Sequence, residues 1–316
     1  MKKMRQLCYA WVLLGIIGFI SASAYAQQKS ISITIDDVPN TTNYQKDNIS
    51  PVLLHVLDSL NVPFTLFINE GRIQKNGFTD INKELLKKWI AHGQALIGNH
   101  TYGHSRYSEV GFDNFVKDIE QGELLTRQYA SMYNKEVRYF RFPFNDLGKD
   151  STQHLQIRAY LKSRDYVIAP FTIESSDWMF NDVYQYYLDN EEPEKAKAIG
   201  EHYVNKTIEL VKFYETLSET IYNRPIKQIY LCHDNAINAV YLADIITRLK
   251  KMNYEIVSFE ESLTDPIYKQ EDSYYKKWGV SWLYRWMNTQ KESVDWMKQE
   301  PDLSEIEKTY NEILKM

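Results

Sequence analysis

The sequence predicts an α/β fold built on a mostly parallel sheet, and two observations support that prediction. From Ser30 onward, strand-like and helix-like segments alternate along the chain, which is the pattern of repeated β-then-α units. About seven strand-like segments fall within roughly 230 residues, which fits one α/β barrel better than a small doubly wound sheet. In either arrangement, ligands bind at the C-terminal ends of the strands. Reactive side chains are therefore expected directly after the strands.

The strands are predicted from short apolar runs. Residues 31–35 alternate with period two, as a half-buried strand does. The short apolar run at 95–98 follows Gly93, which ends a helical pattern. Further strands are expected over 64–68, 139–142, 166–169, 228–232 and 255–259.

The helices are predicted from apolar residues at helical spacing between these strands. Pro51 suits the first turn of the first helix, because a proline there loses no helical hydrogen bond. The segment 112–133 has the pattern of one long amphipathic helix, and a charged helical stretch at 303–315 closes the chain. The other helices are expected over 51–60, 82–92, 152–162, 194–220 and 239–251.

The composition is that of an ordinary globular protein. Of 316 residues, 44% are hydrophobic and 25% charged, which excludes a mostly disordered, collagen-like or coiled-coil chain. The formal charge is −5, so no broad basic surface for nucleic acid is expected. Two cysteines do not suffice for a disulfide-framed miniprotein or a multi-cysteine zinc finger.

The N-terminus has the pattern of a signal peptide. Lys2, Lys3 and Arg5 precede an uncharged, mostly apolar run at 9–20, which is shorter than the roughly 20 residues of a membrane span. Ala24-Tyr25-Ala26 then matches an A-x-A cleavage site. We expect residues 1–26 to be removed, an uncleaved anchor being the alternative. The mature chain would be periplasmic or secreted, with no stable membrane span.

The tail differs in composition from the rest of the chain. Residues 27–262 are expected to form the main domain, and residues 263–316 a helical C-terminal extension. Two interpretations of this extension stay open: aromatic side chains packed against the barrel, or a wall of a sugar-binding groove. The aromatic residues concerned are Tyr274, Tyr275, Trp278, Trp282, Tyr284, Trp286 and Trp296.

Acidic and imidazole side chains follow the first and third predicted strands. Asp36 and Asp37 come directly after the first strand, where alone they could be a turn with solvated charges. His100 and His104 are four residues apart, which on a helical turn would bring both imidazoles to one side. Asp37 could complete a set that suits zinc, cobalt or nickel better than magnesium. Three such ligands leave a position open for water, as in a catalytic site.

Further polar motifs follow the later strands. Arg141 lies near the end of the strand expected at 139–142. An arginine can hold a carboxylate with two hydrogen bonds. Asp177 and Trp178 follow another strand-like region, and His233 ends the strand at 228–232. These groups therefore occur where an α/β fold places its active site.

Taken together, residues 30–260 resemble the polysaccharide deacetylase family, also called the NodB-homology or carbohydrate esterase 4 family. Thr34-Ile35-Asp36-Asp37 is similar to its T-F-D-D motif, and the pair His100 and His104 to its H-[ST]-x-x-H metal motif. The remaining similarities are those of Arg141-Phe142-Pro143-Phe144 to R-x-P-[YF], of Asp177-Trp178 to the D-W motif and of Leu231-Cys232-His233 to L-x-H.

The resemblance implies a distorted (β/α)7 barrel of the NodB-homology type and a metal-dependent hydrolase. Carried over by position, the metal ligands are Asp37, His100 and His104, and the metal is one divalent ion, zinc first, with cobalt or nickel as alternatives. The remaining implied roles are Asp36 as general base, Arg141 as its partner, His233 as general acid, Asp177 as the group that tunes His233, the Phe144 amide as oxyanion donor, and Trp178 and Leu231 as pocket walls.

Two positions depart from the family pattern. Val38-Pro39 stands where glycine usually follows the two aspartates, and Asn145 stands where the third motif often has glycine. Neither departure removes a reacting group, but both could reshape the substrate groove.

The function expected from these features is removal of N-acetyl groups from an acetylated glycan, such as peptidoglycan or a chitin-like polymer, by an exported enzyme. An O-acetyl esterase acting on acetylated xylan would use the same residues. A non-catalytic glycan-binding protein is a further alternative, and a metal-dependent phosphoesterase would need more metal ligands than these motifs supply. The sequence leaves the oligomeric state open.

Overall fold

The computed structural model describes residues 28–315, and its centre is a sheet of parallel strands. The predicted signal peptide lies outside the described residues. The strands are β1 (Lys29–Val38), β2 (Phe64–Ile68), β3 (Ala95–Asn99), β4 (Val137–Phe140), β5 (Val167–Ile168), β6 (Ile173–Glu174), β7 (Lys227–His233) and β8 (Tyr254–Ile256).

The sheet runs in the order β5-β4-β3-β2-β1-β7-β6, and every pair is parallel. β8 pairs with the beginning of β1, at Lys29 to Ile31. β1 lies inside the sheet, between β2 and β7. Its side chains are buried on both faces, the alternating Ile33 and Thr34 alike. Burial on both faces is typical of parallel strands that are covered by helices.

The sheet curls into an open barrel, and a short stretch of chain bridges its opening. β5 and β6 are the two ends of the order above. The Ala169 amide donates to the carbonyl of Phe140 at the end of β4, and the Thr172 amide donates to the Ile229 carbonyl on β7. The distorted (β/α)7 barrel predicted from the sequence is confirmed by this topology.

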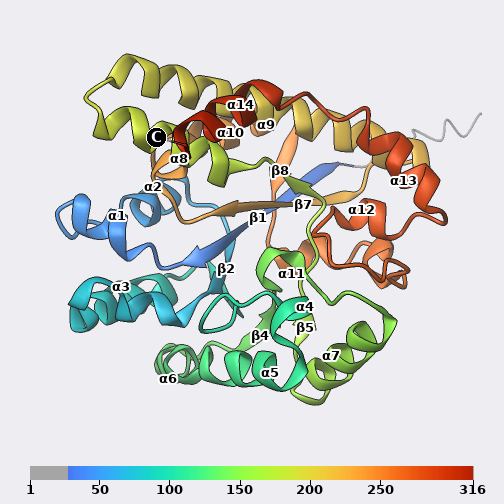
Figure 1. The fold of residues 1–316 in the computed structure, drawn as a ribbon, viewed down its shortest axis with the longest axis horizontal. Helices are drawn as coiled ribbons and strands as arrows, with labels where there is room; N and C mark the ends of the chain where they lie inside the picture. Colours follow the sequence, from blue (N-terminus) through green and yellow to red (C-terminus); the bar gives the residue numbers. More distant parts are fainter. Residues whose placement is uncertain (1–27, 316) are drawn as a thin grey trace, which may run out of the picture.

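Helices cover the outside of the sheet (Figure 1). α9 and α14 lie along one side in that view, and α3, α5, α6 and α7 along the other. The α-helices are α1 (Thr41–Lys46), α2 (Val52–Leu60), α3 (Thr79–Ala91), α4 (Tyr107–Val110), α5 (Phe112–Gln121), α6 (Leu124–Met132), α7 (Ser151–Ser163), α8 (Asp177–Asp189), α9 (Pro193–Tyr222), α10 (Ala236–Lys251), α11 (Phe259–Ser262), α12 (Trp282–Arg285), α13 (Gln290–Met297) and α14 (Ser304–Ile313). The 3₁₀ helices are η1 (Glu70–Gly77), η2 (Pro143–Asn145) and η3 (Pro266–Lys269).

The predicted long helix at 112–133 is wrong, because the chain forms α5 and α6 with a break between them. The break falls at Gly122, where an added Cβ would lie 2.4 Å from the Thr101 carbonyl carbon. The Tyr102 amide also donates to the Asp118 carbonyl at the end of α5. Close approach of the 100–104 loop, which helical periodicity does not encode, therefore ends α5.

Two strand ends also differ from the prediction. The last strand, predicted over 255–259, ends at Ile256, and Phe259 begins α11, whose first turn is capped by the Ser258 side chain. β4 ends at Phe140, so that Arg141 follows the strand. The short strand β6 is the strand-like region expected before Asp177, whereas the helix α8 that follows it was not predicted from the sequence.

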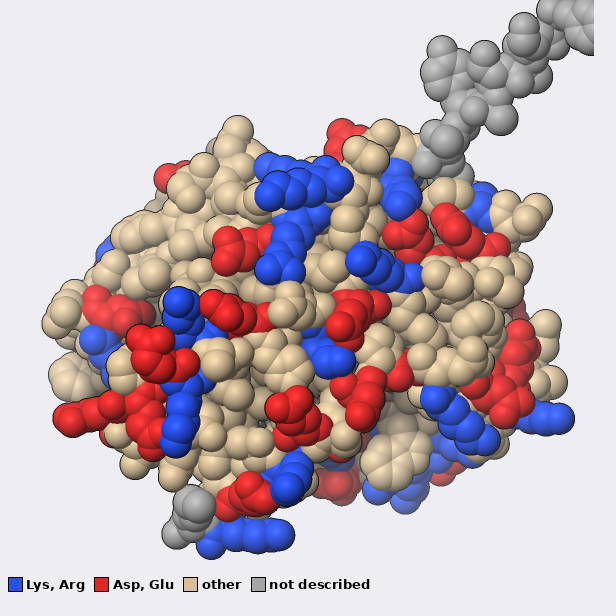
Figure 2. Space-filling view, turned by 90° about the horizontal axis from the view of Figure 1, so that it is seen from above, with Lys and Arg blue, Asp and Glu red and all other residues tan. Residues whose placement is uncertain are grey.

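The C-terminal extension packs on the main body. α14 contacts α8, and Tyr284 and Tyr214 both donate hydrogen bonds to Glu300. On the face shown in Figure 2, basic and acidic side chains are interspersed rather than gathered by sign. Within residues 28–315, no helix has both the length and the apolar character of a membrane span.

Candidate active site

The polar motifs of the sequence meet in one cavity of about 720 Å³ at the C-terminal ends of the strands. The sequence predicted this location from the rule for α/β folds. Eight of the ten predicted site residues line the cavity, together with further polar and aromatic groups. These eight are Asp36, Asp37, His100, His104, Phe144, Trp178, Leu231 and His233. Arg141 and Asp177 lie behind this wall, hydrogen-bonded to Asp36 and His233.

A β-bulge directs both neighbouring aspartates to the site. Successive residues of a regular strand point to opposite faces. The register between β1 and β2 shifts between Ile35 and Val38, and Asp37 has a left-handed backbone with φ 64°. A bulge of this kind re-aims a side chain. Asp36 and Asp37 can therefore serve one site although they are adjacent.

The two histidines lie in a loop and not on a helical turn, so that expectation is wrong. Thr101 and His104 have positive φ angles of 65° and 57°, which interrupt any helix. The imidazole ring centroids of His100 and His104 are nevertheless 5.0 Å apart. A left-handed backbone at a residue other than glycine costs free energy, and such residues tend to gather at functional sites.

Two side chains hold this loop (residues 100–104) in place. The Asn69 amide, just after β2, donates to the carbonyls of Thr101 and Tyr102 at 2.9 and 2.8 Å. The Asp118 carboxylate on α5 accepts the amides of Gly103 and Ser105. The loop is therefore fixed from both the sheet and the helix layer.

Asp37, His100 and His104 fit a metal ion. One possible ligand atom from each lies within 4.8 Å of the other two. The His100 Nδ1 donates to the Arg141 carbonyl at 2.8 Å, since a carbonyl can only accept, which leaves the lone pair on Nε2 facing Asp37. Within residues 28–315, the buried Oδ1 of Asp37 has no hydrogen-bond partner. Because this buried oxygen has no hydrogen-bond partner, it is available to bind a cation together with the two histidines.

Burial tunes the three groups for that role. It lowers the pKa of both His100 and His104 to about 4, which keeps the imidazoles neutral near pH 7. Burial alone would raise the pKa of Asp37, but the nearby positive charges, of which that of Arg72 has the largest effect, together outweigh it, and the pKa lies well below its usual range. Neutral histidines and an ionised carboxylate are the forms that bind metal.

Arg72 is a site residue that the sequence reasoning missed. Its Nη2 donates to Asp37 Oδ2 at 2.5 Å, which leaves Oδ1 toward the histidines. Arg72 lies in η1, four residues after β2 ends at Ile68. The rule that reactive groups follow strands could have found it, since polar residues also follow this strand.

Arg141 is fully buried behind Asp36. Its Nη1 donates to Asp36 Oδ1 at 3.1 Å and to Thr34 Oγ1 at 2.8 Å, and its Nη2 donates to the Pro170 carbonyl. The Arg141 guanidinium also lies over the Phe67 ring, with its central carbon 4.2 Å from the ring centroid. Burial raises the pKa of Asp36 to about 6, although the charge of Arg141 opposes that rise.

His233 and Asp177 form the other side of the site. Asp177 Oδ1 contacts His233 Nδ1 at 2.6 Å, and Asp177 Oδ2 accepts the His233 amide at 2.8 Å. Burial alone would lower the pKa of His233, but the charge and hydrogen bond of Asp177, together with the charges of Asp37 and Asp36, outweigh it and raise that pKa to about 10. His233 is therefore positively charged near neutral pH and has a proton to give.

Two asparagines complete the surroundings of Asp177, and the sequence reasoning missed both. Asn235 and Asn238 donate to Asp177 Oδ2 at 3.0 and 2.5 Å. Asn238 in turn accepts a hydrogen bond from the Tyr203 hydroxyl. Because both oxygens of this buried carboxylate have hydrogen-bond partners, its ionised form is stabilised and its position is fixed.

Aromatic and apolar groups line the rest of the cavity. Phe144 and Asn145 both have positive φ angles, of 57° and 48°, so that the chain turns sharply next to His104. The Phe144 ring lies 4.6 Å from the His104 ring and under the Arg106 guanidinium at 4.0 Å. The lining also includes Glu174 and several residues beyond the motifs, among them Arg106, Asn181, Asp182, Asp234, Trp278 and Gly279.

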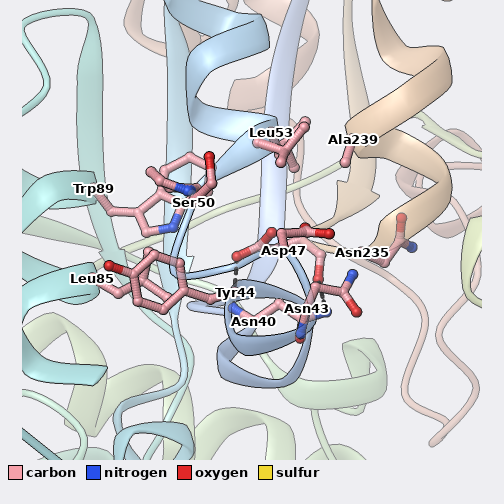
Figure 3. Close-up of a pocket in the computed structure, with 13 residues that line it drawn as sticks. Asn40, Asn43, Tyr44, Asp47, Ser50, Leu53, Leu85, Trp89, Asn235 and Ala239 are labelled. Atoms are coloured by element: carbon pink, nitrogen blue, oxygen red, sulfur yellow. Dashed lines mark hydrogen bonds between the residues drawn. The ribbon is translucent and has the colours of Figure 1, made fainter. Parts of the chain in front are cut away.

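A much smaller cavity lies beside the site and is of another kind. It measures about 20 Å³ and lies between α1, α2, α3 and α10, with Asn40, Tyr44 and Trp89 among the residues that line it (Figure 3). The Asn43 amide donates to Asn40 Oδ1 there, which caps α1. This space is about large enough for one water molecule, so it does not compete as a glycan site.

Comparisons with known proteins agree with the motifs. Residues 24–161 match the family model for polysaccharide deacetylase. A curated peptidoglycan-N-acetylglucosamine deacetylase from Bacillus cereus is 24% identical over 148 residues, which are 47% of this chain and 46% of that protein. The chain thus matches about half the length of that relative. The resemblance to the polysaccharide deacetylase family is confirmed over this region.

Solved structures of related proteins also align with most of the chain. The peptidoglycan deacetylase PdaC from Bacillus subtilis is 18% identical, with a TM-score of 0.48, and the alignment covers 75% of this chain and 93% of that chain. A family 4 carbohydrate esterase pseudoenzyme from Bacillus anthracis is 18% identical, with a TM-score of 0.48, covering 76% of this chain and 66% of that chain.

Proposed function

We propose that this chain, similar over residues 24–161 to the polysaccharide deacetylases, is a metal-dependent hydrolase that removes N-acetyl groups from a glycan of acetylated amino sugars. A single observation carries the proposal. A carboxylate held by an arginine and an imidazole held by a carboxylate flank the Asp37, His100 and His104 cluster in one cavity. That is a base, an acid and a cation site around one reacting position.

The cation site would hold one divalent metal, with zinc preferred and cobalt or nickel as alternatives. Asp37, His100 and His104 would bind it, and Arg72 and the Arg141 carbonyl would orient two of these ligands. When bound, such a metal polarises a carbonyl oxygen and lowers the pKa of water.

The side chains of the protein would move the protons. A water oxygen attacks the acetyl carbonyl carbon, and Asp36 accepts a proton from that water, while Arg141 holds its carboxylate in place. His233 then donates its proton to the amide nitrogen as the carbon–nitrogen bond breaks, which yields acetate and a free amine. Asp177 keeps His233 charged for that step.

The remaining predicted site residues would bind the acetyl group. The Phe144 amide, set in a left-handed turn next to His104, would donate to the oxyanion that forms on the carbonyl oxygen. Trp178 and Leu231 would wall the acetyl methyl, and both line the cavity. We assign catalysis to residues 27–262 and export to the predicted signal peptide at 1–26, which places the enzyme in the periplasm or the medium.

Acetate release tests this function. We expect the purified, chelator-treated protein to be inactive and to regain acetate release from peptidoglycan or chitin oligomers when zinc is restored. His100→Ala should abolish release, whereas His55→Ala, at an exposed position of α2, should not. Release from acetylated xylan alone would instead identify an O-acetyl esterase. Metal binding without release from any of these glycans would contradict the hydrolase and favour a glycan-binding protein.

A further inference from the structure

The C-terminal extension reaches into the site cavity. Trp278 and Gly279 line the same cavity as Asp36, His104 and His233. These two residues lie outside the part of the chain that resembles the deacetylase family. The extension is therefore more than a cover for the outside of the barrel.

The position of this segment is set by a close backbone contact. A Cβ added at Gly279 would lie 2.1 Å from the Phe144 carbonyl oxygen, so no side chain fits there. Phe144 belongs to the left-handed turn beside the metal ligands. Glycine thus lets the extension lie directly against that turn.

Polar contacts fix the extension on both sides of Trp278. After it, Ser281 Oγ donates to the Thr172 carbonyl at 2.7 Å, within the stretch that bridges the barrel opening. Before it, the buried Asp272 carboxylate accepts hydrogen bonds from Arg285 and from Arg158 on α7, both at 2.5 Å. Trp278 is consequently held at the mouth of the cavity by anchors at 272 and 281.

Trp278 differs from the other tryptophans of this segment in its exposure. Trp282 and Trp286 are 6% and 8% exposed and pack together in the interior, while Trp278 is 61% exposed. Its ring is therefore not needed to fill the core. On the same cavity, Phe144 and Trp178 are 48% and 44% exposed, so that three half-open aromatic rings surround the reacting groups.

We propose that Trp278 stacks on a pyranose ring of the glycan next to the sugar whose acetyl group is removed. The C–H face of a pyranose is apolar and matches an exposed indole ring. Hydrogen-bonding side chains such as Asn145, Asn181 and Asp182 line the same cavity and can meet the hydroxyl groups. The extension then makes the enzyme selective for oligomers over monomers.

This inference takes its ligand class from the proposed function, but binding can be measured without catalysis. The probes are the pentamer and the monomer of N-acetylglucosamine, titrated calorimetrically into the full chain after metal removal. We expect the pentamer to bind more tightly than the monomer. Trp278→Ala should weaken pentamer binding about tenfold, as loss of a stacked ring face would, and leave monomer binding unchanged.

The control is Tyr275→Ala, which removes an exposed aromatic of the same segment that contacts His154 away from the cavity. It should leave pentamer binding unchanged, and Trp278→Phe should restore most of it. Equal pentamer affinity of Trp278→Ala and the wild type would overturn the inference, as would a wild-type chain that binds no pentamer. Acetate release, assayed separately, shows whether the proposed hydrolysis fails: pentamer binding that depends on Trp278 without release would refute hydrolysis alone.

Discussion

Single residues set the charge states of the site by their immediate neighbours. His233 faces Asp177, which is itself held by Asn235, Asn238 and the His233 amide. This carboxylate and the charges of Asp37 and Asp36 together favour the charged imidazolium strongly enough to overcome burial, and the pKa of His233 rises to about 10. An acid with that pKa remains protonated throughout the neutral range.

Asp177→Asn should move the alkaline limb of the pH profile. Without the negative charge of Asp177, burial lowers the pKa of His233 against only the charges of Asp37 and Asp36, so that the imidazole loses its proton at lower pH. We expect the limb of kcat/KM near pH 10 to shift downward by more than one pH unit, with about tenfold or greater loss of activity at pH 9. Asp189→Asn, at the exposed end of the same helix, should leave the profile in place. An unshifted alkaline limb in Asp177→Asn would exclude His233 as the acid.

At the scale of elements, the break between α5 and α6 and the loop at 100–104 are one feature. Gly122 allows the loop backbone to approach the end of α5, and Asp118 on that helix accepts two loop amides. The loop in turn presents His100 and His104 toward Asp37. The proposed metal ligands are thus positioned by a helix end that contains none of them.

Asp118→Asn should weaken metal binding. An amide cannot accept both the Gly103 and Ser105 amides as strongly as a carboxylate does, so the loop loses its fixed position. Outer contacts of this kind typically change metal affinity by about 10- to 100-fold, and we expect zinc affinity to fall by that factor in chelator competition. Asp113→Asn, an exposed position on α5, serves as the control. Equal zinc affinities of the two variants would argue against control by α5.

The contact between the extension and η2 gives a second prediction at this scale. In Gly279→Ala the new methyl group would collide with the Phe144 carbonyl and displace the turn that carries the proposed oxyanion donor. Loss of one such donor costs about 10²–10³ in kcat, so we expect kcat to fall by up to about 100-fold, with a small change in KM. Gly93→Ala, where a Cβ meets nothing within 4 Å, should have no such effect. A normal kcat in Gly279→Ala would mean that the position of this turn does not matter for catalysis.

At the scale of the whole molecule, the extension and the barrel are joined through buried ionic groups. Asp272 and Arg285 are both fully buried in the extension, and Arg158 of α7 joins them at Asp272. Replacing one member of a buried pair leaves an unpaired charge, which is costly. The free energy of unfolding of the chain therefore depends on how its last fifty or so residues pack against the barrel.

Asp272→Asn should lower the free energy of unfolding by about 3–5 kcal/mol, since Arg285 would be left buried without its counterion. Urea denaturation followed by tryptophan fluorescence measures this change. Asp302→Asn, an exposed aspartate in the same extension, should change the stability by less than about 0.5 kcal/mol. Similar midpoints for both variants would mean that the extension docks by apolar contacts alone.

The sequence by itself determined the fold class and which residues could react. Period-two and helical patterns predicted most strands and helices, because burial of apolar faces leaves a local periodic record. The motif residues Asp36, His100 and His233 could be singled out since each follows a strand, where α/β folds collect their ligands.

Only the tertiary structure decided how these residues are held. Gly122 ends a helix because of a loop that lies about twenty residues away in sequence, at 100–104. Arg72, which follows β2, contacts Asp37 at the end of the neighbouring strand β1. Trp278 lines the cavity from near the C-terminal end of the chain. Asp37, His104 and Phe144 likewise have left-handed backbones. None of them is a glycine, so their residue types do not predict this conformation. Such contacts join segments distant in sequence, and local periodicity cannot encode them.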